Sequence, residues 1–155
     1  MLAGQPRIKR AKSEHLQPTV FIKLNSRASG KPKVITLKAL LDTGASATIL
    51  KMEHAKKLKI KVDHDTNWAT ASGVISTSKT TKASFTLPEL DHTMVVQWNF
   101  HLAKHLASYD MIIGRDLLQD LGIKMDFNDM TVNYEHVTIP MKPRDATYEE
   151  SLFIQ

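Results

Sequence analysis

The sequence contains no cysteine among its 155 residues. This absence excludes disulfide bridges and zinc sites built on thiolates, and it suits a reducing compartment. No apolar run approaches the about 20 residues that a membrane-spanning helix needs, and the first residues lack the apolar core of a signal peptide. We therefore expect a soluble, intracellular protein with no membrane partner.

Aromatic residues are also scarce, at 6% of the chain, whereas the formal net charge is +5. The positive charges gather near the N-terminus (Arg7, Lys9, Arg10, Lys12) and again further along (Lys51, Lys56, Lys57, Lys59, Lys61). Such charge permits contact with a polyanion. However, no aromatic side chains alternate with these lysines to stack on bases, and the second group is typical of a solvated face. A solvated tail is the favoured interpretation of the first group, and nucleic-acid contact, as the alternative, would involve only this basic leader.

The length predicts one domain that buries roughly 70% of its unfolded surface. Residues 1–18 mix glycine, proline and basic residues without periodicity, which predicts a flexible leader. We expect the folded domain at residues 19–140. Residues 141–155 are expected to form a tail or a polyprotein linker.

Hydrophobic periodicity predicts an all-β fold with one or two short helices. Strands are expected at residues 19–25 and 33–41 (paired as a hairpin), 66–87 (a long hairpin folded about Ser72-Gly73), 94–102, 109–113, 124–134 (a hairpin about Asn128-Asp129) and 137–141. Helical spacing predicts short helices over residues 49–58 and 115–121, the second ending at Gly122.

The most informative stretch is Leu40-Leu41-Asp42-Thr43-Gly44-Ala45-Ser46, in which an apolar run delivers one acid into a turn of small residues. The two leucines are typical of a strand end buried on both faces. Gly44 can take the positive φ that a sharp turn after the acid would need. An ordinary Asx-turn would use the same residues, so this stretch alone leaves a structural and a catalytic interpretation open.

Two further stretches follow it in a fixed order. Thr70-Ala71-Ser72-Gly73 forms the tip of the predicted long hairpin, and Ile112-Ile113-Gly114-Arg115-Asp116 ends an apolar run. Together the three stretches resemble the retropepsins, the aspartic proteases of retroviruses and long-terminal-repeat retrotransposons. Residues 121–127 and 137–141 are most similar to gypsy-type elements. The resemblance covers roughly residues 19–140.

The resemblance implies an acid-protease half-barrel that functions as a symmetric homodimer. Such an enzyme needs two carboxylates that share a proton and activate a water, but this sequence has a single Asp-Thr-Gly. The second acid would therefore be Asp42 of another copy, on the two-fold axis. As in aspartic proteases generally, two carboxylates this close cannot both ionise cheaply, so an acidic to mildly acidic optimum is expected.

The resemblance also implies roles for individual residues. Asp42, Thr43 and Gly44 would form the catalytic loop, with Thr43 bonding across the dimer and Gly44 accepting the substrate backbone. The implied substrate-binding residues are Ala45, Ala47, Thr48, Ala71, Ser72, Gly73 and Ile113, of which residues 71–73 form a flap tip that holds an extended peptide. Gly114, Arg115 and Asp116 would have structural roles.

One position departs from the family pattern. Many retroviral members carry an aspartate two positions after the glycine, where it pairs with the arginine of the Gly-Arg-Asp motif. Here that position is Ser46. Arg115 must then find another partner, either Asp116 or a backbone carbonyl.

The implied function is an aspartic endopeptidase that processes a retroelement Gag-Pol polyprotein, in the cytoplasm or within virus-like particles. A catalytically silent dimeric binding or assembly module is an alternative, although an intact acid motif argues against it, because a buried unpaired carboxylate is costly. A cellular retropepsin-like protease and a basic nucleic-acid-binding domain are further alternatives. No cofactor or metal is expected; Asp63-His64-Asp65 is typical of a solvent-facing turn.

Overall fold

The computed structural model describes residues 4, 6–8, 15–28 and 31–154. Lys9, Arg10 and Lys12 of the predicted basic leader lie outside these residues. The elements, in chain order, are β1 (Thr19–Ala28), β2 (Lys31–Leu41), β3 (Ile49–Lys51), the 3₁₀-helix η1 (Met52–Ala55), β4 (Ile60–Thr70), β5 (Gly73–Leu87), β6 (Asp91–Ala103), β7 (Met111–Ile113), α1 (Arg115–Leu121), β8 (Lys124–Asp126), β9 (Thr131–Tyr134), β10 (Val137–Pro140) and α2 (Tyr148–Ile154). The prediction of an all-β fold with one or two short helices is confirmed.

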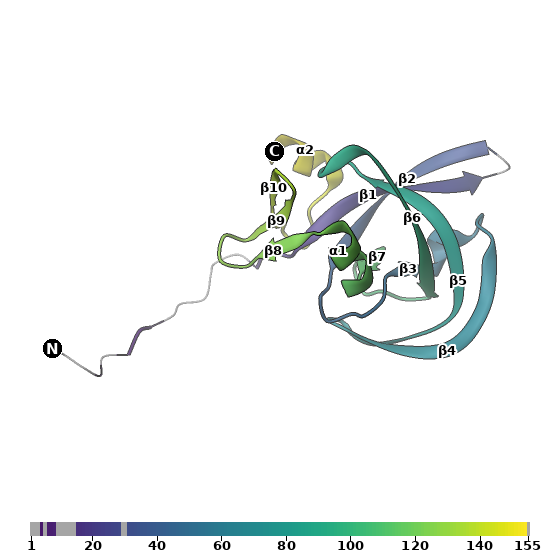
Figure 1. The fold of residues 1–155 in the computed structure, drawn as a ribbon, viewed down its shortest axis with the longest axis horizontal. Coiled ribbons are helices and arrows are strands. Elements are labelled where there is room, and N and C mark those ends of the chain that lie inside the picture. The colour runs from purple at the N-terminus through teal and green to yellow at the C-terminus, as the bar shows by residue number, and fades with distance from the viewer. Residues whose placement is uncertain (1–3, 5, 9–14, 29–30, 155) are drawn as a thin grey trace.

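A closed barrel forms the body of the molecule (Figure 1). Its seven-stranded sheet has the order β1-β2-β7-β3-β6-β5-β4, and an additional pairing of β1 with β5 closes it. Strand β4 stands at the end of this order, and among the described strands it pairs with β5 alone. The predicted hairpin of β1 and β2 is present, with Thr19 opposite Leu40.

Strand β2 ends between β1 and the short strand β7. Strands β2 and β7 run parallel, with Leu40 opposite Ile112 and Leu41 opposite Ile113. Strand β7 also pairs with β3, and β3 runs parallel to β6. The short strand β7 is therefore enclosed on both edges, which explains its fully apolar sequence. This arrangement places Asp42, the residue after β2, in the interior of the fold.

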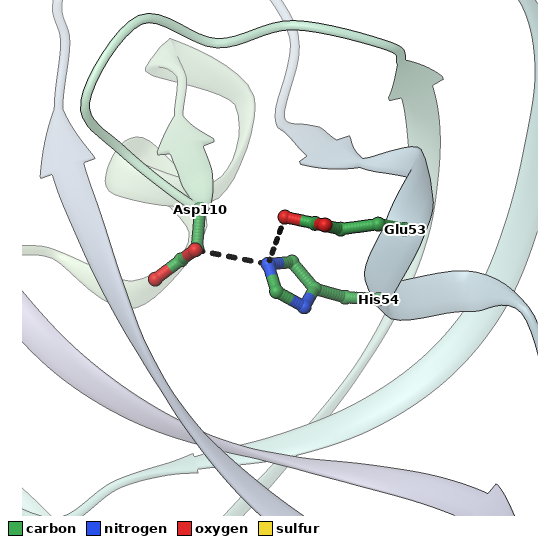
Figure 2. A group of neighbouring side chains, drawn as sticks. All are labelled: Glu53, His54 and Asp110. Carbon is green, nitrogen blue, oxygen red and sulfur yellow. Dashed lines mark hydrogen bonds and ion pairs between the residues drawn. The ribbon is translucent and has the colours of Figure 1, made fainter.

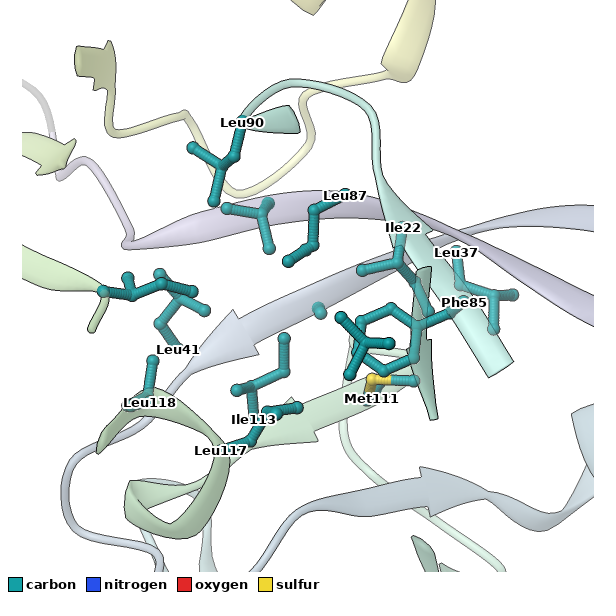
Figure 3. Packing of buried hydrophobic residues seen from close by; sticks show 14 of the residues in the cluster. Ile22, Leu37, Leu41, Phe85, Leu87, Leu90, Met111, Ile113, Leu117 and Leu118 are labelled. Carbon is teal, nitrogen blue, oxygen red and sulfur yellow. The ribbon is translucent and has the colours of Figure 1, made fainter. Parts of the chain in front are cut away.

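The core lies between the barrel sheet and α1 (Figure 3). Phe85 and Phe100 are fully buried, with ring centroids 5.7 Å apart. Leu117 and Leu118 of α1 pack in the same cluster as Leu41. Helix α1 ends at Gly122, whose φ of 72° lies in the left-handed region, as the sequence predicted for a C-terminal glycine stop.

One predicted helix is wrong. Residues 49–58 have helical spacing, but Ile49 and Leu50 belong to β3, and only Met52–Ala55 form a helical turn. The two apolar residues at the start of this segment are fully buried between β6 and β7. Pairing with two neighbouring strands outweighs the weak helical preference of so short a segment.

A second, three-stranded sheet has the order β10-β9-β8 and stands at one end of the molecule, with α1 between it and β7 (Figure 1). Helix α2 packs on β1 through Tyr148, whose ring centroid lies 5.5 Å from that of Phe21. Gln17 forms a β-bridge with Lys142. The residues next to the predicted boundaries at 18 and 141 thus contact each other, and the division itself stays a prediction.

No helix among the described residues is both long enough and apolar enough to cross a membrane.

A buried ion pair joins the barrel to the segment after β10. The Lys142 ammonium lies 2.9 Å from Glu89 Oε2, and both side chains are at most 3% exposed. Lys142 also donates to the Thr19 carbonyl at 2.7 Å, and Glu89 accepts the Phe21 amide at 2.7 Å. Burial lowers the pKa of Lys142, although the Glu89 carboxylate opposes this shift. The pair therefore fastens three distant parts of the chain together.

We expect Lys142→Met to lower the free energy of unfolding by about 3 kcal/mol or more, because it removes the ammonium group that lies against the buried Glu89 carboxylate. Adding Glu89→Gln removes that charge but keeps an acceptor for Phe21, so part of the loss should return. Urea denaturation measures both. The control, Lys51→Met, breaks the more exposed pair with Glu53 and should leave the midpoint almost unchanged. Equal effects of the two lysine variants would contradict the role of the buried pair.

Candidate active site

The acid loop, defined here as residues 42–48, begins where β2 ends. The Asp42 amide donates to the Ile113 carbonyl at 2.9 Å, so the parallel pairing of β2 with β7 continues to the acid itself. Asp42 is 5% exposed. Its Oδ1 accepts the Gly44 amide at 2.9 Å, and its carbonyl accepts the Ala45 amide at 3.2 Å. The backbone thus fixes the direction in which the carboxylate points.

Gly44 serves this turn differently from the expectation. Its φ is not positive; among the described glycines, Gly4, Gly73 and Gly122 have that conformation. A Cβ at Gly44 would lie 3.1 Å from Asp42 Oδ1. The glycine is therefore suited to this position because the carboxylate folds back over it, close to the amide that it accepts.

The tip of the β4–β5 hairpin reaches the same carboxylate. The Ala71 amide donates to Asp42 Oδ2 at 2.7 Å, across 29 positions of sequence. Thr70 closes the tip by donating its hydroxyl to the Gly73 carbonyl at 2.8 Å and accepting the Ser72 amide. Both oxygens of the acid are consequently hydrogen-bonded, one to its own loop and one to the hairpin. The hairpin covers the acid in this conformation.

An apolar cluster lies between the acid loop and this hairpin. Its buried members are Ala45, Ile49, Ala103, Leu106 and Ile112. Trp68 and Ile75, on opposite strands of the hairpin, pack against it. Trp68 also donates its indole N–H to the Thr77 hydroxyl at 2.8 Å, and its ring packs at a tilt against His101 with a centroid distance of 4.7 Å. The hairpin is therefore held close to its tip by Trp68 and Ile75, while residues 71–74 at the tip itself are exposed.

A polar network fixes the far end of the acid loop. The Thr48 hydroxyl donates to Asp116 Oδ1 at 2.8 Å and accepts the Gly114 amide at 3.1 Å. Asp116 also accepts the amides of Thr48 and Leu117, and the indole N–H of Trp98 at 3.3 Å. One carboxylate thus joins the acid loop, α1 and β6. The sequence analysis assigned Asp116 a structural role but gave no signal for its partner Trp98, which lies 18 positions away.

The backbone of Gly114 packs directly against two carbonyl groups of the acid loop and leaves no room for a side chain. A Cβ at this position would lie 2.3 Å from the Ala47 carbonyl oxygen and 2.8 Å from that of Ala45. The next residue, Arg115, donates its amide to the Ala45 carbonyl at 2.8 Å. This close approach of two backbones is what requires glycine here.

The arginine of the same motif uses one of its two predicted partners. Arg115 Nη1 donates to the Thr43 carbonyl at 3.3 Å, whereas Asp116 is engaged by Thr48 and Trp98. Thr43 and Arg115 are both exposed. The guanidinium therefore braces the residue next to the acid from the solvent side, with no carboxylate needed at Ser46.

Two residues predicted to bind substrate lie elsewhere. Ile113 is fully buried in the main core, whereas Ile112, on the opposite face of β7, belongs to the cluster that the hairpin covers. A one-residue shift along a strand reverses the face. Thr48 is also fully buried, and its hydroxyl is used within the network. The structure thus places Ile112 rather than Ile113 beneath the hairpin and Thr48 within a buried network, and the substrate-binding roles of Ile113 and Thr48 stay predictions.

The described residues offer one group of three potential metal ligands, Glu53, His54 and Asp110 (Figure 2). His54 Nε2 lies 2.9 Å from Asp110 Oδ1, and Lys51 lies 2.9 Å from Glu53. Burial alone would raise the pKa of Asp110, but the hydrogen bonds from His54 and from the Lys38 amide lower it overall. Lys51 and His54 already pair with the carboxylates of this group, and the pairs connect η1 to the residue before β7. Residues 63–65 are exposed, as predicted, but they belong to strand β4 and not to the turn that the sequence indicated.

Comparison with known proteins agrees with this geometry. The family model described as retroviral aspartyl protease matches residues 14–126. Among solved structures, the retroviral protease-like domain of Ddi1 from Leishmania major has a TM-score of 0.59 at 17% identity, covering 86% of this chain and 100% of that domain. The EIAV protease, solved with the inhibitor HBY-793, has a TM-score of 0.47 at 25% identity, covering 76% and 100%. No curated protein sequence matches significantly. The predicted retropepsin-like fold is confirmed.

We expect Gly114→Ala to lower the free energy of unfolding by at least about 3 kcal/mol, because the new methyl group cannot fit between two backbone carbonyls. Thermal and urea unfolding measure the change. The control is Ser46→Ala, an exposed position in the same loop, which should have little effect. A variant as stable as the parent would show that the acid loop can move away from α1.

The hydrogen bond between the hairpin tip and Asp42 predicts slow amide exchange at Ala71. In Asp42→Ala the acceptor is lost, so we expect the Ala71 amide to exchange about tenfold faster or more, measured by NMR solvent exchange. The Ser72 amide is an internal control, because its acceptor is the neighbouring Thr70 hydroxyl. Unchanged exchange at Ala71 would mean that the tip does not rest on the acid in solution.

Proposed function

The chain belongs to the retroviral aspartyl protease family, and from this premise we propose that it is an aspartic endopeptidase acting as a symmetric homodimer on extended peptide segments. The observation that carries the proposal is the Asp42 carboxylate itself. It is 5% exposed, directed by the Gly44 amide, and covered by a hairpin tip from another part of the chain. A single acid of this kind cannot act as both acid and base, so a second Asp42 must come from another copy.

In the proposed reaction the two Asp42 side chains hold one proton between them. The ionised carboxylate takes a proton from water as the water oxygen attacks the scissile carbonyl carbon. The protonated carboxyl gives its proton to the carbonyl oxygen. Together, the attack and this proton transfer form a tetrahedral intermediate. That intermediate collapses as the C–N bond breaks and a proton passes to the leaving nitrogen, which regenerates the shared-proton pair.

The hairpin tip would then act as a flap. Its amide at Ala71 occupies Asp42 Oδ2 at 2.7 Å, so substrate and water can reach the acid only after this bond breaks. The tip residues Ala71, Ser72 and Gly73 are exposed and offer backbone groups to an extended peptide by strand addition. Ala45, Ala47 and Ile112 would line the apolar side of the cleft.

Thr43 and Arg115 are suited to the dimer contact beside the acids. Both are exposed, and the Arg115 guanidinium holds the Thr43 carbonyl. Thr43 follows Asp42 directly, so in a dimer with two adjacent Asp42 side chains it faces its counterpart. Its hydroxyl would bond across the axis and join the two acid loops.

We propose a retroelement Gag-Pol polyprotein as the substrate, with processing in the cytoplasm or within virus-like particles. The gypsy-like residues 121–127 and 137–141 favour this assignment over a cellular retropepsin-like protease. Nucleic-acid contact would involve the basic leader alone. A silent dimeric module is the second candidate, and the flap bond to Asp42 is the observation that favours it, because it fills the place of a substrate.

We expect the chain to cleave a mixed peptide library between pH 3 and 7, with specific activity that rises with protein concentration. Asp42→Asn removes the ionisable group at nearly constant shape and should lower kcat/KM by at least about a thousandfold. Asp145→Asn, a matched change at an exposed aspartate away from the site, should leave activity unchanged. Mass spectrometry of the products measures both.

Two outcomes would contradict this proposal. Equal cleavage by the Asp42→Asn variant would place the chemistry elsewhere. Absence of cleavage at any concentration by a correctly folded chain would favour the silent module.

A further inference from the structure

We propose that Glu53, His54 and Asp110 form a binding site for one divalent transition-metal ion of the zinc type, where η1 meets the residue before β7 (Figure 2). These residues are separate from the acid loop, and the inference goes beyond the proposed protease activity without depending on it. No sequence motif marks the site, because His54 and Asp110 lie 56 positions apart.

The first observation is the spacing of the donor atoms. His54 Nε2 lies 2.9 Å from Asp110 Oδ1 and 3.7 Å from Glu53 Oε1. One donor atom of each residue lies within 4.8 Å of the other two. Ligands held about 2.0 to 2.1 Å from a tetrahedral zinc ion are separated from one another by roughly 3.3 Å. The two measured separations fall on either side of that value, so a zinc ion fits among these atoms after small rotations of the side chains.

The second observation is that two carboxylates face a single nitrogen. Figure 2 shows oxygens of Glu53 and Asp110 both directed at the same ring nitrogen of His54. That nitrogen carries at most one hydrogen, and its separation of 3.7 Å from Glu53 is too long for a hydrogen bond. The imidazole thus satisfies only one of the two carboxylates. A cation placed among the three groups would contact both carboxylates at once.

The chemistry of the donors indicates which ion the site would take. Imidazole nitrogen suits zinc, copper, nickel and iron, whereas oxygen donors alone suit magnesium, calcium or manganese. One nitrogen and two carboxylate oxygens belong to the mixed donor sets that zinc accepts, and a water molecule would complete four ligands. The two negative charges of Glu53 and Asp110 balance the charge of a dication.

Groups outside the cluster hold Asp110 in place. Its Oδ2 accepts the Lys38 amide at 2.9 Å, which leaves Oδ1 directed at His54. Its backbone carbonyl accepts the Lys51 amide at 2.9 Å, and its own amide donates to the Lys38 carbonyl at 3.0 Å. Outer hydrogen bonds of this kind orient metal ligands and raise their affinity. The side chains of His54 and Asp110 are 17% and 33% exposed, so the site is partly enclosed and still open to an ion from solvent.

Lys51 is the natural competitor of the ion. Its ammonium group lies 2.9 Å from Glu53 Oε1, the same oxygen that faces His54. The Lys51 side chain is 28% exposed, and its flexible stem lets the ammonium move into solvent when a dication takes its place. Removal of Lys51 should therefore strengthen metal binding, whereas a group that serves only as an ion pair would show no such gain.

Calorimetric titration of zinc chloride into the full, untagged chain, after dialysis against a chelator, tests the site. We expect one zinc ion per chain and a thermal midpoint that rises with zinc concentration, because the ion binds the folded arrangement. His54→Gln keeps a hydrogen-bond donor for Asp110 but removes the imidazole, and it should weaken zinc binding about a hundredfold or more. His64→Gln, at an exposed histidine between Asp63 and Asp65, is the matched control and should bind zinc like the parent.

Lys51→Met provides the second test. It should lower the zinc dissociation constant about threefold or more, because zinc no longer competes with the ion pair to Glu53. Lys57→Met removes the same charge from an exposed lysine of the same segment and should leave the dissociation constant unchanged. Circular dichroism without zinc checks that every variant keeps the fold.

Three outcomes would overturn the inference. The parent chain takes up no zinc at millimolar concentration, or His54→Gln binds zinc as tightly as the parent, or binding is lost in His64→Gln instead, which would place the metal on β4. None of these measurements uses peptide cleavage, so the result stands whether or not the chain is a protease.

Discussion

The structure depends on the close packing of the connection between β7 and α1 against the backbone of the acid loop. Gly114 lies so near the Ala45 and Ala47 carbonyls that a methyl group would collide with both. At the start of the loop the Asp42 amide donates to the Ile113 carbonyl. At its end the Thr48 hydroxyl donates to Asp116 and accepts the Gly114 amide. These contacts fix both ends of the loop. The buried Asp42 carboxylate therefore has little room to change its direction.

That rigidity contrasts with the hairpin that covers the acid. Close to its tip it is held by Trp68, which packs on the apolar cluster and against the His101 ring, and the tip itself contacts the acid through the backbone of Ala71. In the proposed function this bond between the tip and the acid must break before a peptide can enter, and the hairpin would then close on the extended chain. The sequence holds only one such acid motif, and the proposed function therefore requires a second copy of the chain.

Much of this could be predicted because the information is local. The run before Asp42, the tip at Ser72-Gly73 and the helix that ends at Gly122 each follow from a few adjacent residues. The contacts that position the acid are not local: Trp98 reaches Asp116, and Lys142 reaches Glu89, through pairings that no periodicity encodes. The sequence also could not show that Ile112, and not Ile113, lies beneath the hairpin. A fully apolar strand gives no sign of which of its faces meets the core and which meets the hairpin.

The central claim is that one working site requires two copies of this chain. Its most direct test is the binding stoichiometry of a short peptide whose scissile bond is replaced by a hydroxyl-bearing tetrahedral mimic, measured by calorimetric titration. The account predicts saturation at one mimic for every two chains, with heat that disappears when Asp42 is replaced by asparagine. Saturation at one mimic per chain, or binding that does not depend on Asp42, would contradict it.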